Sequence, residues 1–349
     1  MKKILVIRND KIGDFMLAWP SFAMLKQSMP ECHITALVPN YTKALAELCP
    51  WIDEVMVDPT NKGSKTEQKQ LIEQIKSAQF DASINLFSTT YNALLVWQAG
   101  IKYRLAPATK LAQIFYNKRI KQNRSQSAKP EYEYNLDLIR AFLADQNVNV
   151  VEPTSPYLSF SSSELSMQKK KLSESLEIDV SRPWIYLHAG SGGSANNLSL
   201  EQYTQLYSEL NLESECILTA GPGEEEKARE LQVLLKQKGI NAVVYDKNEG
   251  LVDFTRSIAC ADLFIAGSTG PLHIAATLDV PTVGFFPSKR SATPLRWRPI
   301  NSEGNHIAFC PPKAGDKQSQ EDMARIDIND ITIELKGWVF EKLRLEARG

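Results

Sequence analysis

One stretch of small and hydroxyl-bearing residues could bind a phosphate. Ser268-Thr269-Gly270-Pro271 lies between an apolar run at 263–267 and an apolar-periodic segment that ends near Leu278. This order predicts a buried strand, a tight turn and a helix. Small residues let a ligand approach the backbone closely, and the first N–H groups of a helix lack internal partners. Because the helix dipole adds partial positive charge there, the turn predicts a phosphate or pyrophosphate site.

Two more turns of this kind follow strands that precede it in the sequence. His188-Ala189-Gly190-Ser191-Gly192-Gly193-Ser194 could donate to phosphate oxygens, and Gly221-Pro222-Gly223-Glu224-Glu225-Glu226 could hold ribose hydroxyls with its carboxylates. Each turn alone is better explained as an ordinary strand–helix connection. Together, at the ends of successive parallel strands, they predict a crevice that binds a ligand. His273, on the helix after the phosphate turn, is better explained as a buried structural histidine.

A carboxylate near the N-terminus could act as a general base. A strand at 3–8 leads into Asp10-Lys11-Ile12-Gly13-Asp14, where a helix begins. Asp14 could cap that helix or take a proton from an attacking hydroxyl. Asp10, beside Lys11, is the competing carboxylate. The residues alone favour capping for Asp14.

Composition excludes several classes of protein. The chain has 349 residues, 43% hydrophobic and 23% charged, with a formal net charge of −1, so two domains are expected and nucleic acid is not an expected partner. Five scattered cysteines without CxxC spacing indicate reduced thiols and a cytoplasmic protein. The four histidines lack metal-site spacing. The chain shows neither a signal peptide nor an apolar run of about 20 residues, so we expect at most peripheral membrane contact. It has no GxGxxG after its first strand, which excludes the Rossmann dinucleotide fingerprint, and no GxxxxGK[ST], which excludes a P-loop.

Strands and helices alternate along the sequence. Strands are expected at 3–8, 33–39, 54–58, 82–87, 184–189, 215–220, 242–246, 262–267 and 282–286, and helices at 15–29, 41–49, 66–78, 131–146, 162–176, 200–210, 223–238, 251–260, 270–279 and 328–347. This alternation predicts an α/β fold with parallel sheets and helices on both faces. Residues 151–156 form a plausible linker, which gives domains at 1–155 and 156–349. The final helix could pack on either domain, including back on the first.

A stretch of 49 residues, 82–130, contains no Asp or Glu. Its basic residues are Lys102, Arg104, Lys110, Lys118, Arg119, Lys121, Arg124 and Lys129, with aromatic residues interleaved. The stretch is either a solvated basic surface or a site for an anionic partner, and the two interpretations carry equal weight.

As a set, these motifs resemble one family. The elements that carry the resemblance are Lys11-Ile12-Gly13-Asp14, Phe115-Tyr116-Asn117-Lys118-Arg119, His188-Ala189-Gly190-Ser191, Gly223-Glu224-Glu225-Glu226 and 268–276. Over nearly its whole length the chain resembles the ADP-heptose:lipopolysaccharide heptosyltransferases, which are inverting glycosyltransferases of family 9. The resemblance implies the GT-B fold, in which two Rossmann-like parallel-sheet domains face a cleft.

The resemblance also implies roles for individual residues. Asp14 would be the catalytic base, Glu224 would hold the ribose, and domain closure would bring the base to the acceptor hydroxyl. The other donor-binding positions would be Ser191, Asn196, Ser268, Thr269, Gly270, Pro271 and His273, and the acceptor-binding positions Asp10, Lys11, Gly13, Lys118 and Arg119. The partners would be a nucleotide-sugar donor and an anionic lipid-linked saccharide acceptor at the cytoplasmic face of the inner membrane, with no metal and no cofactor.

Two positions depart from the family pattern. Asn196 lies where members often carry a lysine, and Ser268 lies where many carry an aspartate. Both would lie near the donor sugar, so we expect its recognition to be looser. Two alternatives stay open: a nucleotide-sugar 2-epimerase on the same fold, and a non-catalytic protein that binds a nucleotide sugar or a carbohydrate.

Overall fold

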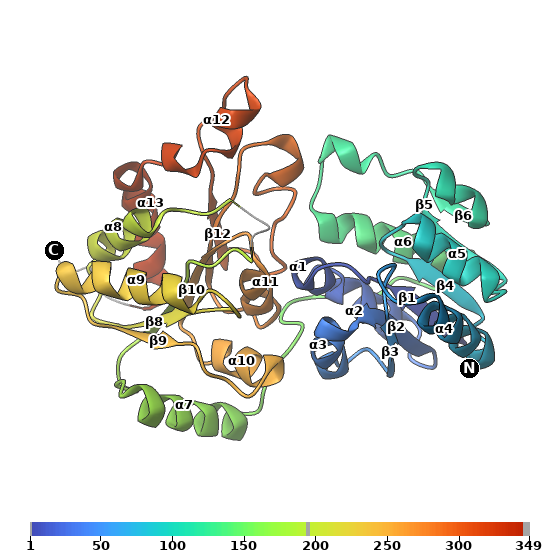
Figure 1. The fold of residues 1–349 in the computed structure, drawn as a ribbon, viewed down its shortest axis with the longest axis horizontal. Coiled ribbons are helices and arrows are strands. Elements are labelled where there is room, and N and C mark those ends of the chain that lie inside the picture. Colours follow the sequence, from blue (N-terminus) through green and yellow to red (C-terminus); the bar gives the residue numbers. More distant parts are fainter. Residues whose placement is uncertain (1, 193–195, 345–349) are drawn as a thin grey trace. The chain divides into compact units, whose positions relative to one another are not determined.

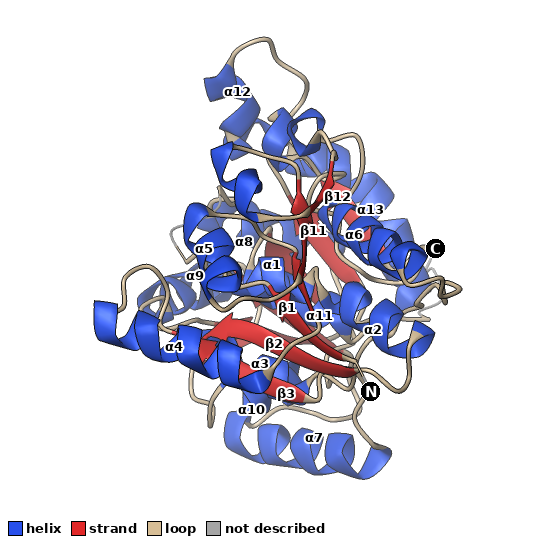
Figure 2. Ribbon diagram, turned by 90° about the vertical axis from the view of Figure 1, so that its right-hand side faces the viewer, coloured by secondary structure: helices blue, strands red, loops and turns tan. Residues whose placement is uncertain are grey.

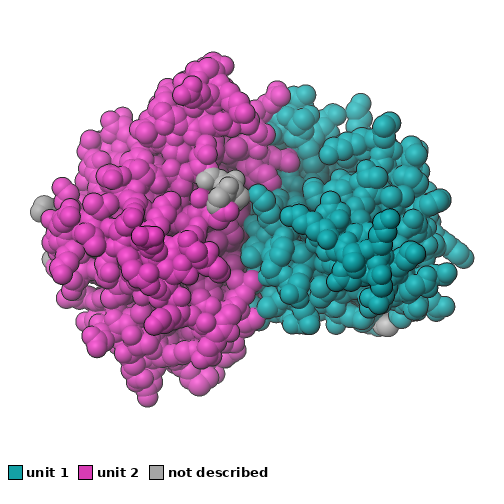
Figure 3. Space-filling view, viewed as in Figure 1, with its two compact units in different colours: residues 1–157 teal, residues 158–349 magenta. Residues whose placement is uncertain are grey.

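The computed structural model describes residues 2–192 and 196–344 (Figure 1). The chain divides into two compact units, Met1–Tyr157 and Leu158–Gly349 (Figure 3). The boundary lies two residues after the one expected from the sequence. Gly193, Ser194 and residues 345–347, which the sequence interpretation included, lie outside the described residues.

The first unit is built on one parallel sheet in the order β3-β2-β1-β4-β5-β6. Its strands are β1 (Lys3–Ile7), β2 (His33–Pro39), β3 (Glu54–Asp58), β4 (Ala82–Asn85), β5 (Tyr103–Pro107) and β6 (Lys118–Ile120). Helices cover both faces, as Figure 2 shows for α2, α3 and α4 beside strands β1 to β3. On one face Leu5, Ile7 and Leu37 pack with the apolar sides of α4 and α5. Burial of both faces explains why these strands are almost continuously apolar.

The helices of the first unit are mostly short. They are α1 (Ile12–Met16), α2 (Trp19–Ser28), α3 (Lys43–Leu48), α4 (Lys65–Ala78), α5 (Thr90–Gln98) and α6 (Glu131–Asp145), with 3₁₀ turns η1 (Asn40–Thr42), η2 (Leu111–Phe115) and η3 (Arg124–Gln126). The single helix expected at 15–29 is two helices. Pro20 lies in the first turn of α2, where its missing N–H costs no hydrogen bond, so a new helix begins there.

The second unit repeats this topology. Its parallel sheet has the order β12-β11-β10-β7-β8-β9. Its strands are β7 (Trp184–His188), β8 (Glu215–Thr219), β9 (Ala242–Tyr245), β10 (Leu263–Gly267), β11 (Thr282–Phe285) and β12 (His306–Phe309). Counted from its first strand, each sheet has the Rossmann order 3-2-1-4-5-6, so the predicted pair of Rossmann-like parallel sheets is confirmed.

The C-terminal helix belongs to the second unit. The helices of this unit are α7 (Ser162–Leu176), α8 (Leu200–Leu210), α9 (Glu225–Gln237), α10 (Leu251–Ile258), α11 (Gly270–Thr277), α12 (Lys317–Glu321) and α13 (Ile328–Lys342), with 3₁₀ turns η4 (Arg290–Ala292) and η5 (Met323–Arg325). Leu335 and Val339 of α13 are buried in one core with Leu206 of α8 and Leu231 of α9. The packing of this helix on the first unit, which the sequence left open, is therefore not the arrangement found.

Candidate active site

In each sheet, the strand order reverses beside the first strand of the unit. The reversal lies between β1 and β4 in the first unit and between β7 and β10 in the second. Loops that leave neighbouring parallel strands in opposite directions open a crevice at their carboxyl ends, where ligands bind in open α/β sheets. The segment 8–14 follows β1, and the turns at 189–192 and 268–270 follow β7 and β10. Segments predicted from the sequence to carry candidate site residues therefore lie at both reversal points.

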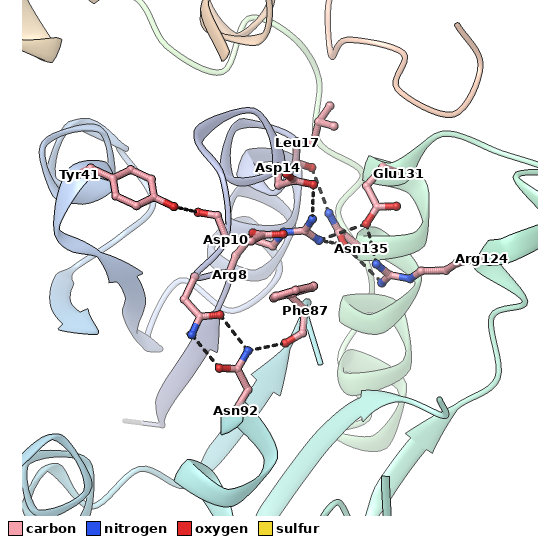
Figure 4. A network of polar contacts seen from close by, with 11 residues as sticks. Arg8, Asp10, Asp14, Leu17, Tyr41, Phe87, Asn92, Arg124, Glu131 and Asn135 are labelled. Atoms are coloured by element: carbon pink, nitrogen blue, oxygen red, sulfur yellow. Dashed lines mark hydrogen bonds and ion pairs between the residues drawn. The ribbon is translucent and has the colours of Figure 1, made fainter. Parts of the chain in front are cut away.

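Arg8 is the centre of a buried cluster of charges in the first unit (Figure 4). Its side chain is buried directly after β1, and its guanidinium lies 5.6 Å from the centre of the Phe87 ring, which follows β4. Nε donates to Asp10 at 2.8 Å, Nη2 donates to Asp14 at 2.7 Å, and Nη1 donates to Glu131 at 3.1 Å. One guanidinium thus fixes both candidate carboxylates and ties them to the first residue of α6.

Two further side chains, Arg124 and Asn135, hold Arg8 and Glu131 in place. Arg124 donates to the same Glu131 oxygen at 2.7 Å. Asn135, one turn further along α6, accepts from Arg8 at 3.4 Å and donates to the carbonyl of Leu17 at 3.4 Å. Figure 4 shows these side chains converging from the β1 loop, α6 and the η3 segment. Sequence reasoning missed Arg8, Glu131 and Asn135, because nothing in their local sequence links residues more than a hundred positions apart.

Charge balance in the cluster explains the titration of its members. Burial opposes the charge of Arg8, but Asp10, Asp14 and Glu131 together outweigh burial and raise its pKa. Burial, reinforced by the charge of Asp14 and only partly offset by Arg8, raises the pKa of Asp10 to about 7. Arg8 divides its N–H groups among three carboxylates, which is why burial and the charge of Asp14 outweigh its effect on the pKa of Asp10.

Asp14 does not cap its helix. The N-cap of α1 is Lys11, no side chain bonds to the free N–H groups there, and Asp14 lies within the first turn. Its side chain reaches Arg8 and remains 17% exposed, so it is both fixed and open to a ligand. The capping interpretation favoured by the residues alone is therefore wrong. Lys11 is exposed and Gly13 half-buried beside it, so the predicted positions 10, 11, 13 and 14 lie on one short segment.

Lys118 and Arg119 lie apart from this cluster. Both are on the edge strand β6, where successive side chains point to opposite faces of the sheet. Lys118 pairs at 3.0 Å with Asp145, the last residue of α6, whereas Arg8 binds Glu131, the first residue of the same helix. The 15 residues of α6 span about 21 Å. The structure therefore does not bring Lys118 beside Asp14, and Arg124 is the basic residue of the acid-free stretch that pairs within the cluster.

In the second unit, β10, β7 and β8 are neighbours, so the three predicted turns lie together. Glu224 joins two of them. Its carboxylate accepts from the backbone N–H groups of Ser191 at 2.7 Å, Gly192 at 2.7 Å and Gly221 at 3.2 Å. A Cβ at Gly190 would collide with this carboxylate, so glycine is needed for the close approach. The N–H groups predicted to meet phosphate oxygens at this turn are thus occupied by an internal anion.

The charge of Glu224 is stabilised by these contacts. Burial raises its pKa, but the N–H groups of Gly192 and Ser191 and the neighbouring His188 outweigh burial, so its pKa is lowered overall. Burial lowers the pKa of His188 to about 4, against the opposing effect of Glu224. His188 Nδ1 lies 2.9 Å from the Thr219 hydroxyl, which fixes the ring between β7 and β8. At neutral pH this turn therefore presents an ionised carboxylate beside a neutral imidazole.

Asn197 ties the first turn to the third, and sequence reasoning missed it. Its amide donates to the carbonyls of Ala189 and Gly190 at 3.0 and 3.1 Å and accepts from the Tyr203 hydroxyl at 2.7 Å. A Cβ at Gly267 would lie 2.6 Å from the Asn197 oxygen, so the two segments are in close contact. With Glu224, this amide fixes all three turns relative to one another.

The phosphate turn has an unused hydroxyl. Thr269 is the N-cap residue of α11, and Gly270 and Pro271 form its first turn. The Thr269 Oγ1 is buried without a hydrogen-bond partner among the described residues. An unpaired buried hydroxyl is costly unless a ligand supplies the partner. Burial lowers the pKa of His273 to about 4, which agrees with its interpretation as a buried histidine.

The two positions that depart from the family pattern differ in their surroundings. Asn196 is exposed, and its amide donates to the backbone carbonyl of Glu321 at 2.8 Å. Ser268 is half-buried, and its backbone N–H donates to Phe285 of β11. Within residues 2–192 and 196–344, no group of three His, Cys, Asp or Glu side chains is arranged to hold a metal ion.

Comparisons with known proteins identify the family. Residues 68–325 match the family model described as "Glycosyltransferase family 9 (heptosyltransferase)". The chain belongs to this family. It is 55% identical to a "Putative glycosyltransferase" of Haemophilus influenzae over 96% of both chains. It is also 23% identical to the "Lipopolysaccharide core heptosyltransferase OpsX" of the same organism, over 90% of this chain and 86% of the relative.

A solved structure agrees with this assignment at the level of the fold. The "ADP-heptose lps heptosyltransferase II" of Escherichia coli superimposes with a TM-score of 0.75 at 19% identity, over 98% of this chain and 100% of the other. The family 9 protein is thus a glycosyltransferase with the GT-B fold, as the resemblance implied. Its fold, family and general activity are confirmed, and the donor, the acceptor and the roles of individual residues remain predictions.

Proposed function

We propose that this family 9 glycosyltransferase transfers heptose from ADP-heptose to a saccharide of the lipopolysaccharide inner core, with inversion at the anomeric carbon. The observation that carries the proposal is that the two units hold different chemical groups at their strand reversals. One holds a fixed, accessible carboxylate at its strand reversal, and the other holds a phosphate turn with an unpaired hydroxyl. The names of the relatives, which include heptosyltransferases, support the choice of sugar.

Asp14 is the proposed general base. The acceptor hydroxyl loses its proton to the Asp14 carboxylate as its oxygen bonds to the anomeric carbon. The bond between that carbon and the phosphate oxygen breaks, and its electron pair leaves with ADP. Arg8, held by Asp10 and Glu131 as well, keeps the Asp14 carboxylate pointing in one direction through the reaction.

The turns of the second unit are proposed to hold the donor. The Thr269 hydroxyl and the first N–H groups of α11 stabilise the charge that develops on the departing pyrophosphate. Gly270, Pro271 and His273 belong to the helix that begins at this turn, and Ser191, on the turn after β7, is a further proposed donor contact. Asn196 and Ser268 are the proposed contacts to the sugar. Glu224 is the proposed ribose ligand, and it can take that role only by exchanging some of its bonds to Ser191, Gly192 and Gly221.

Asp10, Lys11 and Gly13 are the proposed acceptor contacts, since they share one segment with the base. Lys118 and Arg119 stay proposed contacts only for an acceptor long enough to extend along the unit. Because such an acceptor is lipid-linked, we propose that the protein acts at the cytoplasmic face of the inner membrane as a peripheral protein. None of the helices at 2–192 and 196–344 is both long and apolar enough to cross a membrane.

A donor panel with truncated lipopolysaccharide acceptors, analysed by mass spectrometry, tests the proposal. We expect a mass increase of one heptose with ADP-heptose, and NMR of the product should show an inverted anomeric centre. Conversion of a nucleotide sugar without any acceptor would support the 2-epimerase instead. Donor binding without turnover on any acceptor would support a non-catalytic binding protein.

A further inference from the structure

The first unit exposes two large apolar side chains on one turn of 3₁₀ helix. Leu111 and Ile114 of η2 are 89% and 71% exposed. Residues three apart eclipse in a 3₁₀ helix, so both side chains project on the same side of η2. The other side of this segment is anchored, because Ala112 and Tyr116 are buried in the core of the unit. η2 therefore presents a fixed apolar ridge to solvent.

A tryptophan extends this ridge. Trp97 of α5 is 49% exposed, and its ring lies 5.2 Å from that of Phe115, the last residue of η2. An indole ring is apolar except for its N–H group, so it suits the boundary between a membrane and water. Among the described residues of the second unit, by contrast, the large exposed apolar side chains lie singly on separate helices and loops: Met167, Val180, Val233, Leu295 and Ile333. Single exposed residues of that kind are ordinary.

Unpaired cations surround the ridge. Three of the basic residues at 82–130 form ion pairs, namely Lys118, Arg124 and Lys129. Four others are exposed without an ion pair to any described residue: Lys102, Lys110, Arg119 and Lys121. Lys110 is the N-cap of η2, and Arg119 lies on the sheet face that carries η2, since it pairs in register with Ala106 of the same core. The Asn117 amide binds the carbonyl of Lys102, which places that residue beside the end of η2.

We propose that this surface, which we call the η2 patch (Trp97, Leu111 and Ile114 with Lys102, Lys110 and Arg119), docks the enzyme on an anionic lipid bilayer. Apolar side chains that enter the headgroup region, ringed by cations, are the elements of peripheral membrane binding. The absence of Asp and Glu from residues 82–130 removes the repulsion that anionic headgroups would otherwise meet. The inference deepens the proposed function, because it names the surface that would bring the enzyme to a lipid-linked acceptor.

Cosedimentation with lipid vesicles tests the η2 patch without donor or acceptor. The full chain is mixed with phosphatidylcholine vesicles that contain phosphatidylglycerol and, separately, with vesicles of phosphatidylcholine alone. We expect binding to the first and much weaker binding to the second. Leu111→Ser with Ile114→Ser should reduce binding more than about tenfold, and Lys102→Glu with Lys110→Glu by a similar factor, since each cation near the surface contributes about fivefold.

Matched variants of the second unit serve as controls. Ile333→Ser removes an apolar side chain that is 83% exposed, and Lys236→Glu with Lys238→Glu reverses two exposed cations. Both should bind vesicles as the wild type does. Quenching of tryptophan emission by brominated acyl chains should be smaller in Trp97→Phe. Equal binding by the η2 variants and the controls would overturn the proposal.

Two further outcomes separate this inference from others. If light scattering finds a dimer that the Leu111→Ser, Ile114→Ser variant loses, the patch is an interface between copies of the chain and the membrane proposal is overturned. Transfer to a lipid-free saccharide acceptor should be unchanged in the η2 variants. If vesicle binding behaves as expected and the wild type transfers no heptose, the proposed function fails while the η2 patch stands.

Discussion

The two units have the same strand order and place their candidate residues at the same point of it, yet they present different groups to a ligand. The first presents charged side chains, Asp10 and Asp14, on a buried guanidinium. The second presents the first N–H groups of α11 and the Thr269 hydroxyl, and its carboxylate Glu224 is held by backbone N–H groups instead of a guanidinium. The same topology thus presents different chemical groups at its strand reversal, because these groups depend on a few loop residues and not on the fold.

The strongest test of this comparison removes the proposed base. Asp14→Asn keeps the shape of the side chain but cannot accept the proton, so kcat should fall by about 10²–10⁴. Donor affinity should stay near the wild-type value, because the donor turns are on the other unit. Steady-state kinetics and calorimetric titration of ADP measure the two effects. Asp53→Asn, which loses a pair with Lys26 instead, is the control and should retain activity. An Asp14→Asn enzyme with most of its activity would refute the role of Asp14.

Arg8→Lys tests whether the guanidinium positions the carboxylates. Lysine keeps the charge, but its N–H groups are all on one nitrogen, whereas the planar guanidinium contacts three carboxylates through three nitrogens. We expect kcat to fall about tenfold and the free energy of unfolding to fall by about 2–3 kcal/mol, since buried charges lose their partner. Urea denaturation and kinetics should show both changes. Loss of stability at unchanged kcat would make Arg8 a structural residue only.

Thr269→Val tests the second unit, where we expect a loss of ligand binding without a loss of stability. The Thr269 hydroxyl has no partner among the described residues, so its removal should leave stability unchanged or slightly increased. ADP should bind about tenfold more weakly, because a hydrogen bond to a charged phosphate is lost. Thr277→Val, in the same helix but bonded to the His273 carbonyl, should not change ADP affinity. Unchanged ADP binding in Thr269→Val would remove this hydroxyl from the donor site.

A smaller effect should appear in the pH dependence of stability. The folded state raises the pKa of Asp10 from its ordinary value of 3.8 to about 7. Between these values the native protein retains a proton that the unfolded chain has lost, so the free energy of unfolding falls as pH rises. We expect this decrease between pH 4 and pH 7, and a flat profile above pH 7, where Asp10 becomes ionised in both states. Asp10→Asn should flatten the profile in urea denaturation. An unchanged slope would show that Asp10 is ionised throughout this range.

The smallest effect concerns donor selectivity. Asn196 and Ser268 replace one positive and one negative group of the family pattern, so recognition of the sugar should rest on neutral hydrogen bonds. We expect the wild type to accept ADP-hexoses beside ADP-heptose, and Asn196→Lys with Ser268→Asp to favour ADP-heptose a few-fold more. Competition assays with paired donors measure this ratio. Strong discrimination in both forms would show that neither position contacts the sugar.

The sequence by itself determined the periodic and local parts of this protein. Apolar runs separated by glycine and small polar turns specified nine strands, because burial on both faces requires them to be apolar. It missed β5, β6 and β12. Lys118–Ile120 is a three-residue edge strand with two exposed cations, and the strand at 306–309 buries only its last residue, so neither shows the apolar run of a buried strand. The strand, small turn and helix around Thr269-Gly270 were predictable for the same local reason, since all three are consecutive in the chain.

Only the tertiary structure decided which side chains meet. Arg8 and Glu131 are separated by 123 positions, yet the strand order brings the end of β1 against the start of α6. Arg8, fixed by that contact, binds Asp14, which is therefore a fixed carboxylate and not the expected helix cap. Likewise, Glu224 reached Ser191 because β7 and β8 are neighbours in the sheet. Strand and helix signals are local in the sequence, whereas the pairing of charges depends on distances that exist only after the sheet has formed.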